Sequence, residues 1–258
     1  MGLGDNLMAT GLARGAAKKG RPVAFGDGNR IIWDQHSEQI FRSNPNIAMP
    51  SHHRDRNLTW IPFYKGHRIY NSLDRANNRW KWNYDFKAAP GEIYLWDHEK
   101  TQGGRYGRGF VLIEPNVPWW KSVAPNKDWG IENYQRVADL LVAEGHRVAQ
   151  FVNPKGARLN GVEQLATTSF RDALAILKNA GVYVGPEGGL HHGAAAVGVP
   201  AVVLFGGFIP PAVTGYDAHV NLTGGAEACG SLSACEHCKV AMKAISVDEV
   251  FSAAKDRL

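Results

Sequence analysis

The second half of the chain alternates apolar, strand-like runs with amphipathic, helix-like runs, and this alternation limits the fold more than any other feature. Strands are predicted at residues 109–114, 147–152, 181–184 and 201–205, and helices at 131–145, 169–179, 190–197 and from about 247 onward. Repeated strand–helix–strand units form parallel sheets with right-handed crossovers. The pattern therefore predicts an α/β fold built on a parallel sheet.

The first half of the chain is less regular. Helices are predicted at 7–19 and 34–43, and strands at 21–25, 58–64 and 92–96. The polar, glycine-rich stretch 97–108 has the composition of an interdomain linker. We therefore expect two domains, at residues 1–105 and 106–258.

Net charge and the distribution of apolar residues indicate which partners the protein can bind and where it is located. The net charge of +5 and the sequence pI of about 9.1 suit an anionic ligand. Lysine and arginine form no block of five or six, which argues against a nucleic-acid partner. No apolar run reaches the roughly 18–20 residues of a membrane span, and the N-terminus lacks a signal pattern. Together with the three clustered cysteines, these features predict a cytoplasmic protein.

The strand predicted at 181–184 leads into a glycine-rich turn and a helix. Glycines such as Gly188 and Gly189 let the backbone approach a ligand, and the free N–H groups of a helix start suit a pyrophosphate. Glu187 would repel phosphate, so sugar or ribose hydroxyls are its expected partners, and His192 could donate to a phosphate or sugar oxygen. The alternative is a tight strand-to-helix turn that binds no ligand.

Two further segments carry candidate residues. Asp5 lies in a glycine-rich helix start between Gly4 and Asn6, where it could act as a general base; it could equally cap the helix. Lys127 follows the first predicted strand of the second half and could reach a phosphate at the same sheet edge, or simply be solvated.

Cysteines cluster late in the chain, at Cys229, Cys235 and Cys238. Their spacing suits half of a zinc or iron–sulfur site, with His237 or His219 as a fourth ligand. Three reduced thiols in a loop are the alternative. Tryptophans such as Trp80, Trp82, Trp119 and Trp120 could stack on sugars or bases, although each alone is more simply explained as a core residue.

Taken together, these residues resemble glycosyltransferase family 9, the ADP-heptose:lipopolysaccharide heptosyltransferases. Residues 2–7 resemble the family's N-terminal glycine–aspartate motif, and residues 127–129 its Lys-x-Trp stretch. Residues 187–196 resemble its Asp-Thr-Gly-x-x-His-x-x-Ala-Ala motif, and residues 198–206 complete it. Glu187 and Gly188 depart from the motif by replacing the aspartate and the threonine. The family also has a strand before the glycine–aspartate motif, so that strand is either absent from the sheet or encoded upstream of Met1.

The resemblance implies a GT-B fold, in which two Rossmann-like domains with parallel sheets face a cleft, here with a short first domain. It implies an inverting transferase in which Asp5 is the general base and Gly4 and Asn6 lie on the acceptor side. Lys127, Glu187, Gly188, Gly189 and His192 would bind a nucleotide-sugar donor. No cofactor is required on this reading, because the lysine and the helix dipole supply the positive charge; a structural zinc at the cysteines is an additional expectation. The acceptor would be a glycan or a lipopolysaccharide-type glycolipid, met at the inner membrane surface.

Two other functions fit the same plan. A sugar-nucleotide epimerase or hydrolase would release free sugar or isomerised donor without an acceptor. A non-catalytic protein would bind nucleotide without turning over any donor.

Overall fold

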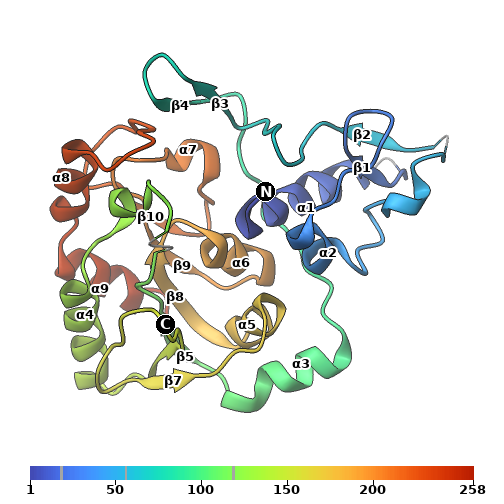
Figure 1. Cartoon of the computed structure of the whole chain (residues 1–258). Coiled ribbons are helices and arrows are strands. Elements are labelled where there is room, and N and C mark those ends of the chain that lie inside the picture. The colour runs from blue at the N-terminus through green and yellow to red at the C-terminus, as the bar shows by residue number, and fades with distance from the viewer. Residues whose placement is uncertain (18–19, 56, 118–119) are drawn as a thin grey trace.

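The computed structural model describes residues 1–17, 20–55, 57–117 and 120–258, and its largest element is a six-stranded parallel sheet in the second half of the chain (Figure 1). The strands lie in the order β10-β9-β8-β5-β6-β7, and every neighbouring pair is parallel. Their bounds are β5 Phe110–Ile113, β6 Val148–Phe151, β7 Glu163–Leu165, β8 Ala180–Pro186, β9 Ala201–Leu204 and β10 Val220–Leu222. The α/β prediction is confirmed. Because the strand order reverses between β5 and β8, a crevice is expected at the carboxyl ends of these two strands.

Helices cover both faces of the sheet, because alternate residues of each strand point to opposite sides. In β5, Phe110 and Leu112 belong to one core cluster, and Val111 and Ile113 belong to another. The first cluster packs under α5 (Phe170–Leu177) and α6 (Gly189–Val197). The second packs under α4 (Ile131–Ala143) and α9 (Val247–Lys255). Two short helices complete this half: α7 (Pro211–Thr214) and α8 (Glu236–Ala244).

The first half adds few strands. Helix α1 (Leu3–Ala17) lies against α6 and α2 (Gln35–Phe41), and its residues share the first core cluster (Figure 1). Strands β1 (Val23–Phe25) and β2 (Thr59–Ile61) form a two-stranded parallel sheet. Strands β3 (Asn71–Asp74) and β4 (Arg79–Trp82) form a hairpin that extends over the second half of the molecule (Figure 1). The expected division into two Rossmann-like domains at residue 105 stays a prediction.

The predicted linker at 97–108 is wrong, because most of it is helical. Helix α3 (Asp97–Gly103) and the 3₁₀ turn η2 (Gly104–Tyr106) pack against α5. The glycine that suggested flexibility allows close packing instead: a Cβ on Gly103 would lie 2.4 Å from the carbonyl oxygen of Ala175. The Glu99 carboxylate accepts a hydrogen bond from the N–H of Trp96 at 2.8 Å and so caps the helix.

Other differences are smaller. The expected strand at 92–96 is absent, and that segment is irregular. Helix α1 begins at Leu3 rather than residue 7, while residues 18–19 of that prediction lie outside the described residues. Two further 3₁₀ turns occur, η1 (Pro50–His52) and η3 (Ala124–Lys127). None of the helices among the described residues is long and apolar enough to cross a membrane.

Candidate functional site

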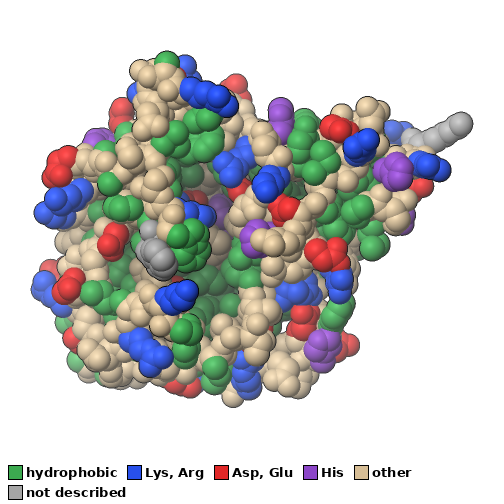
Figure 2. All heavy atoms as spheres, viewed as in Figure 1, with side chains coloured by type: hydrophobic (Ala, Val, Ile, Leu, Met, Phe, Trp, Pro, Cys, Tyr) green, Lys and Arg blue, Asp and Glu red, His purple; other side chains and the backbone are tan. Residues whose placement is uncertain are grey.

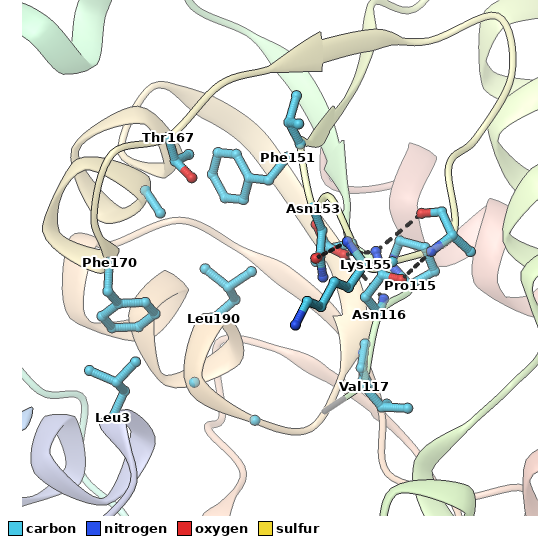
Figure 3. Close-up of a pocket in the computed structure, with 18 of the residues that line it drawn as sticks. Leu3, Pro115, Asn116, Val117, Phe151, Asn153, Lys155, Thr167, Phe170 and Leu190 are labelled. Atoms are coloured by element: carbon cyan, nitrogen blue, oxygen red, sulfur yellow. Dashed lines mark hydrogen bonds between the residues drawn. The ribbon is translucent and has the colours of Figure 1, made fainter. Parts of the chain in front are cut away.

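A cavity of about 990 Å³ opens at the carboxyl ends of β5, β6 and β8 (Figure 3). Glu187, Gly188 and Gly189 form one edge of it, as expected for the glycine-rich turn. Asn153 and Lys155, from the loop after β6, lie on the opposite side, with the Lys155 side chain directed into the opening (Figure 3). The cavity therefore lies at the switch point of the sheet, where α/β proteins of this order bind ligands. In the space-filling view this face is hollowed, and apolar side chains lie in the hollow (Figure 2).

The turn after β8 leaves a helix start open toward the cavity. Strand β8 ends at Pro186, and α6 begins at Gly189 with Gly188 as its N-cap. No side chain among the described residues caps this helix, so its first N–H groups remain available to a ligand. Such N–H groups, at the positive end of the helix dipole, favour an anion.

Glu187 is buried in a cluster of charged and aromatic groups beside this turn. Its carboxylate forms an ion pair with the Lys127 ammonium, which also donates to the Glu187 carbonyl oxygen at 3.4 Å. The Nε2 of His192 lies 3.4 Å from the second carboxylate oxygen. Burial opposes ionisation of the carboxyl, but Lys127 and His192 outweigh it and hold the pKa of Glu187 well below its ordinary value. Three of the residues predicted for donor binding therefore meet in one cluster.

Two aromatic side chains that the sequence did not single out complete this cluster. A hydrogen bond of 2.8 Å joins the Tyr216 hydroxyl to Nδ1 of His192 and fixes the orientation of that ring. His191 is fully buried against Tyr216, with ring centroids 5.1 Å apart, and neither of its ring nitrogens has a hydrogen-bond partner within the described part of the chain. Burial lowers the pKa of His191 well below its ordinary value, so this ring stays neutral at pH 7.

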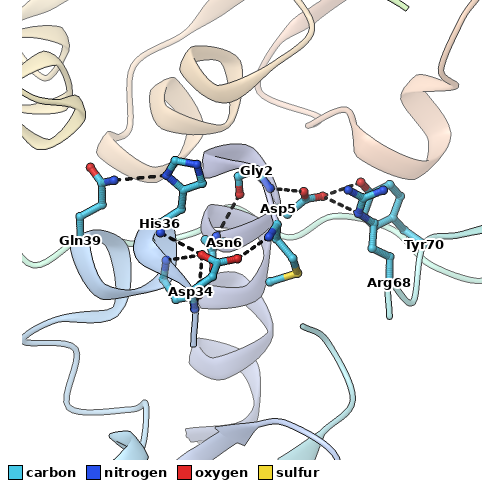
Figure 4. Close-up of polar contacts among 10 residues, drawn as sticks. Gly2, Asp5, Asn6, Asp34, His36, Gln39, Arg68 and Tyr70 are labelled. Carbon is cyan, nitrogen blue, oxygen red and sulfur yellow. Dashed lines mark hydrogen bonds and ion pairs between the residues drawn. The ribbon is translucent and has the colours of Figure 1, made fainter. Parts of the chain in front are cut away.

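Asp5 lies in the first turn of α1 and is surrounded by donors (Figure 4). The Tyr70 hydroxyl donates to Oδ1 at 2.5 Å, and the N–H of Gly2 donates to Oδ2 at 2.7 Å. The Arg68 side chain lies 3.6 Å from Oδ1. Tyr70 and Arg68 precede the β3–β4 hairpin, where the sequence offered no periodic pattern to mark them. Only 8% of Asp5 is exposed, so its position is fixed by these contacts.

Helix α1 brings Asp5 close to the turn between β8 and α6. A Cβ on Gly4 would lie 2.5 Å from Cδ2 of His192, so only glycine allows this approach of α1 to α6. Asn6 points the other way (Figure 4): its amide donates to the Gly2 carbonyl oxygen at 2.9 Å and accepts from Ser37 at 2.9 Å. Asn6 is fully buried. Its expected contact with an acceptor stays a prediction, and its observed role is to hold α1 on α2.

The cavity lining and the predicted residues overlap in part. Leu3 reaches the cavity from α1, but Asp5, Lys127 and His192 are not among the lining residues. Trp120 lines the cavity and is 69% exposed, Trp80 and Trp82 are half-buried in the hairpin, and Trp119 lies outside the described residues.

Glu114 is a buried lining residue that no sequence motif marked, although it directly follows β5. Burial raises the pKa of its carboxyl to about 7, while two N–H donors of Asn116 partly oppose the shift. Its position at the carboxyl end of a central strand was the sequence signal that could have marked Glu114 as a site residue.

The three cysteines come together. The Sγ atom of Cys229 lies 3.7 Å from that of Cys235 and 3.3 Å from that of Cys238. Among the described residues, neither histidine considered as a fourth ligand joins this group. Nε2 of His237 lies 2.8 Å from the carbonyl oxygen of Glu227, and the His219 ring packs against Tyr216. The expectation of a histidine ligand is therefore wrong for this arrangement.

Comparison with known proteins decides the family. The sequence profile of glycosyltransferase family 9 (heptosyltransferase) matches residues 95–239, which is more than half of the chain. The chain belongs to glycosyltransferase family 9. Among curated protein sequences, none matches it.

Solved glycosyltransferase structures share the fold. A family 9 glycosyltransferase from Veillonella parvula superposes with a TM-score of 0.66 at 14% identity, over 99% of this chain and 94% of that one. The iron-containing dodecameric glycosyltransferase TibC of enterotoxigenic E. coli gives a TM-score of 0.60 at 14% identity, over 99% of this chain and 73% of its own. The match to E. coli ADP-heptose heptosyltransferase II has 20% identity and a TM-score of 0.49, and covers 64% of this chain. This chain spans about half of that enzyme, 53% of its length.

Proposed function

We propose that the protein is an inverting glycosyltransferase that takes a sugar, a heptose by analogy with its family, from a nucleotide-sugar donor. The observation that carries the proposal is the cavity at the sheet switch point, bordered by Glu187, Gly188 and Gly189. Its volume of about 990 Å³ can hold a nucleotide diphosphate with its sugar. A glycan or glycolipid is the proposed acceptor, met at the cytoplasmic face of a membrane.

The donor phosphates would lie at the start of α6. Free N–H groups at Gly189 and beyond, together with the helix dipole, stabilise the charge that develops on the leaving diphosphate. The Lys127 ammonium adjoins this turn through Glu187 and can turn toward a phosphate. Glu187 and His192 are then placed to contact sugar hydroxyls.

Asp5 is the proposed general base. Its carboxylate takes the proton of the acceptor hydroxyl as the hydroxyl oxygen attacks the anomeric carbon. The bond from that carbon to the diphosphate oxygen breaks, and the nucleotide diphosphate leaves with the bonding electrons. Attack on the face opposite the leaving group inverts the anomeric configuration. Tyr70 and the Gly2 N–H orient the carboxylate for this transfer.

The three cysteines are proposed to bind a structural metal ion, zinc or, as TibC is described, iron. Zinc–sulfur bonds of about 2.3 Å place tetrahedral sulfur ligands about 3.8 Å apart, and the measured separations of 3.3 and 3.7 Å are close to that value. Burial and the neighbouring thiols raise the pKa of Cys238. The metal would hold the loop together and takes no part in the transfer.

The test separates binding from catalysis. A thermal-shift screen with ADP-, GDP-, UDP- and CMP-sugars identifies the donor, because a ligand that binds the folded state raises its melting temperature. With that donor, we expect Asp5→Asn to lower transfer at least 100-fold while donor binding stays within about twofold. Asp27→Asn, on an exposed turn, serves as the control.

Sugar transfer by Asp5→Asn at the wild-type rate would refute Asp5 as the general base. Release of free sugar without any acceptor would instead identify a hydrolase. Binding of donor with no turnover under any condition would identify a non-catalytic nucleotide-binding protein.

A further inference from the structure

The three cysteines lie in a loop, residues 229–238, that contacts both halves of the molecule; we call it the cysteine loop. Cys235 is the N-cap of α8, and Cys238 lies in its first turn. The N–H groups of Cys229 and Gly230 donate to the carbonyl oxygens of Gly207 and Phe208, at 2.8 and 3.0 Å. The loop is thus attached to the segment that follows β9.

Asn126 joins the cysteine loop to the donor side of the site. Its amide nitrogen donates to the carbonyl oxygens of Ser233 and Ser231, at 2.9 and 3.3 Å, and its amide oxygen accepts from the N–H of Cys235 at 3.0 Å. The side chain is 1% exposed and forms all of these bonds with the loop. Lys127 is the next residue, and its ammonium lies 5.2 Å above the Phe208 ring.

The same loop holds the hairpin that approaches Asp5. The N–H of Trp80 donates to the Gly230 carbonyl oxygen at 2.8 Å, and the N–H of Leu232 donates to the Asn78 carbonyl oxygen at 3.1 Å. Gly230 has a φ of +67°, and a Cβ there would lie 2.3 Å from the Trp80 carbonyl oxygen, so the contact requires glycine. The Trp80 ring in turn lies 5.5 Å from the Arg68 guanidinium, which faces Asp5.

We infer that the metal-loaded cysteine loop is a brace that sets Lys127 and Asp5 relative to each other, with Asn126 as the positioning residue on the donor side. The inference rests on the proposed metal and donor sites. Fixing an irregular loop costs conformational entropy. A metal held by three sulfurs fixes the loop before the donor binds, so this cost does not weaken donor binding. Removing the metal should therefore weaken the binding of a nucleotide diphosphate by Lys127.

The experiment measures ADP affinity by calorimetry on the full-length protein, with metal content determined by elemental analysis. We expect one zinc or iron per chain, and weakening of ADP binding by about 5–30-fold after chelation or in Asn126→Ala, the equivalent of one or two lost hydrogen bonds. Ser233→Ala is the matched control, because it keeps the backbone carbonyl that Asn126 contacts and should bind ADP like the wild type.

Two combinations separate positioning from a general loss of structure. In a Lys127→Ala background, Asn126→Ala should change ADP affinity less than twofold, because the residue it positions is gone. Removing the metal from the Asn126→Ala variant by chelation should likewise weaken ADP binding little further. Asn126→Asp keeps the acceptor for Cys235 and provides a second variant if the alanine variant unfolds, which far-UV circular dichroism detects.

The possible outcomes distinguish failure of the ADP site, of the metal site and of the brace. Wild-type protein that holds its metal but does not bind ADP would refute the proposed ADP site. Protein that carries no metal would refute the metal site. Equal ADP affinity in loaded, chelated and Asn126→Ala protein would overturn the brace while leaving both sites intact.

Discussion

At the scale of single residues, the candidate site is built from groups whose burial is balanced by a partner. Glu187 is ionised because Lys127 and His192 face it, and Asp5 accepts bonds from Tyr70 and Gly2. The sequence could suggest Glu187, Lys127 and Asp5 one at a time, from motifs. It could not pair Glu187 with Lys127, since 60 residues separate them, and the fold alone brings them together.

Glu114 differs because none of the described cations faces its buried carboxyl. The protein's stability should therefore depend on pH. Its pKa is about 7 in the folded protein, against an ordinary value of 4.5. Between these values the unfolded chain is deprotonated while the folded protein keeps the proton, so the free energy of unfolding falls as pH rises from about 4.5 to about 7 and levels off above that. From pH 5 to pH 8 this loss should be on the order of 2–3 kcal/mol.

Urea unfolding of Glu114→Gln at these two pH values measures the effect. The variant should lose less stability than the wild type over the interval, by on the order of 2–3 kcal/mol. Glu227→Gln changes an exposed carboxyl and should keep the wild-type profile. Identical profiles for Glu114→Gln and wild type would show that Glu114 titrates normally in the folded state.

At the scale of elements, helices and strands were predicted correctly where the local sequence pattern agrees with the burial of the side chains. Helix α5 begins after Ser169, whose hydroxyl accepts from the Asp172 N–H at 3.1 Å, as its cap sequence indicates. Strands β7 and β10 have three residues each and gave no usable periodicity. Helix α3 was missed because its polar composition matches a linker, whereas its packing on α5 is a tertiary effect.

Helix α1 offers a test of close packing. In Gly4→Ala the new methyl group would meet the His192 ring at 2.5 Å, and that ring is buried and bonded to Tyr216. We expect a loss of about 1–3 kcal/mol in the free energy of unfolding. Gly15→Ala lies in the same helix, and its added Cβ would meet no side chain or other segment of the described chain within 4 Å, so it should gain up to about 1 kcal/mol from helix propensity. Equal effects of the two substitutions would show that α1 does not pack on α6 as described.

At the scale of the whole molecule, no sheet runs through both halves of the described chain, and the halves are joined by backbone hydrogen bonds of the hairpin and by side chains. Arg171 on α5 is the most connected of these. Its guanidinium donates to both Glu99 carboxylate oxygens, at 2.6 and 2.5 Å, and to the carbonyl oxygens of Tyr94 and Gln39, at 2.7 and 2.9 Å. One buried charge thus joins α5, α3 and α2. Such a junction depends on contacts up to 132 residues apart, so no local pattern could have predicted it.

Arg171→Met should therefore weaken the whole assembly. It leaves Glu99, whose side chain is 14% exposed, without its cation, and it leaves two backbone carbonyls without a donor. Breaking a buried pair in this way destabilises a protein by about 3–5 kcal/mol. Adding Glu99→Leu should recover part of that loss, because the uncompensated carboxylate is removed. Arg42→Met disrupts an exposed ion pair with Glu38 at the C-terminal end of α2 and should change stability by less than about 0.5 kcal/mol. Thermal unfolding of the four proteins measures the effect, and a melting temperature for Arg171→Met equal to that of Arg42→Met would mean that the halves are held together without this junction.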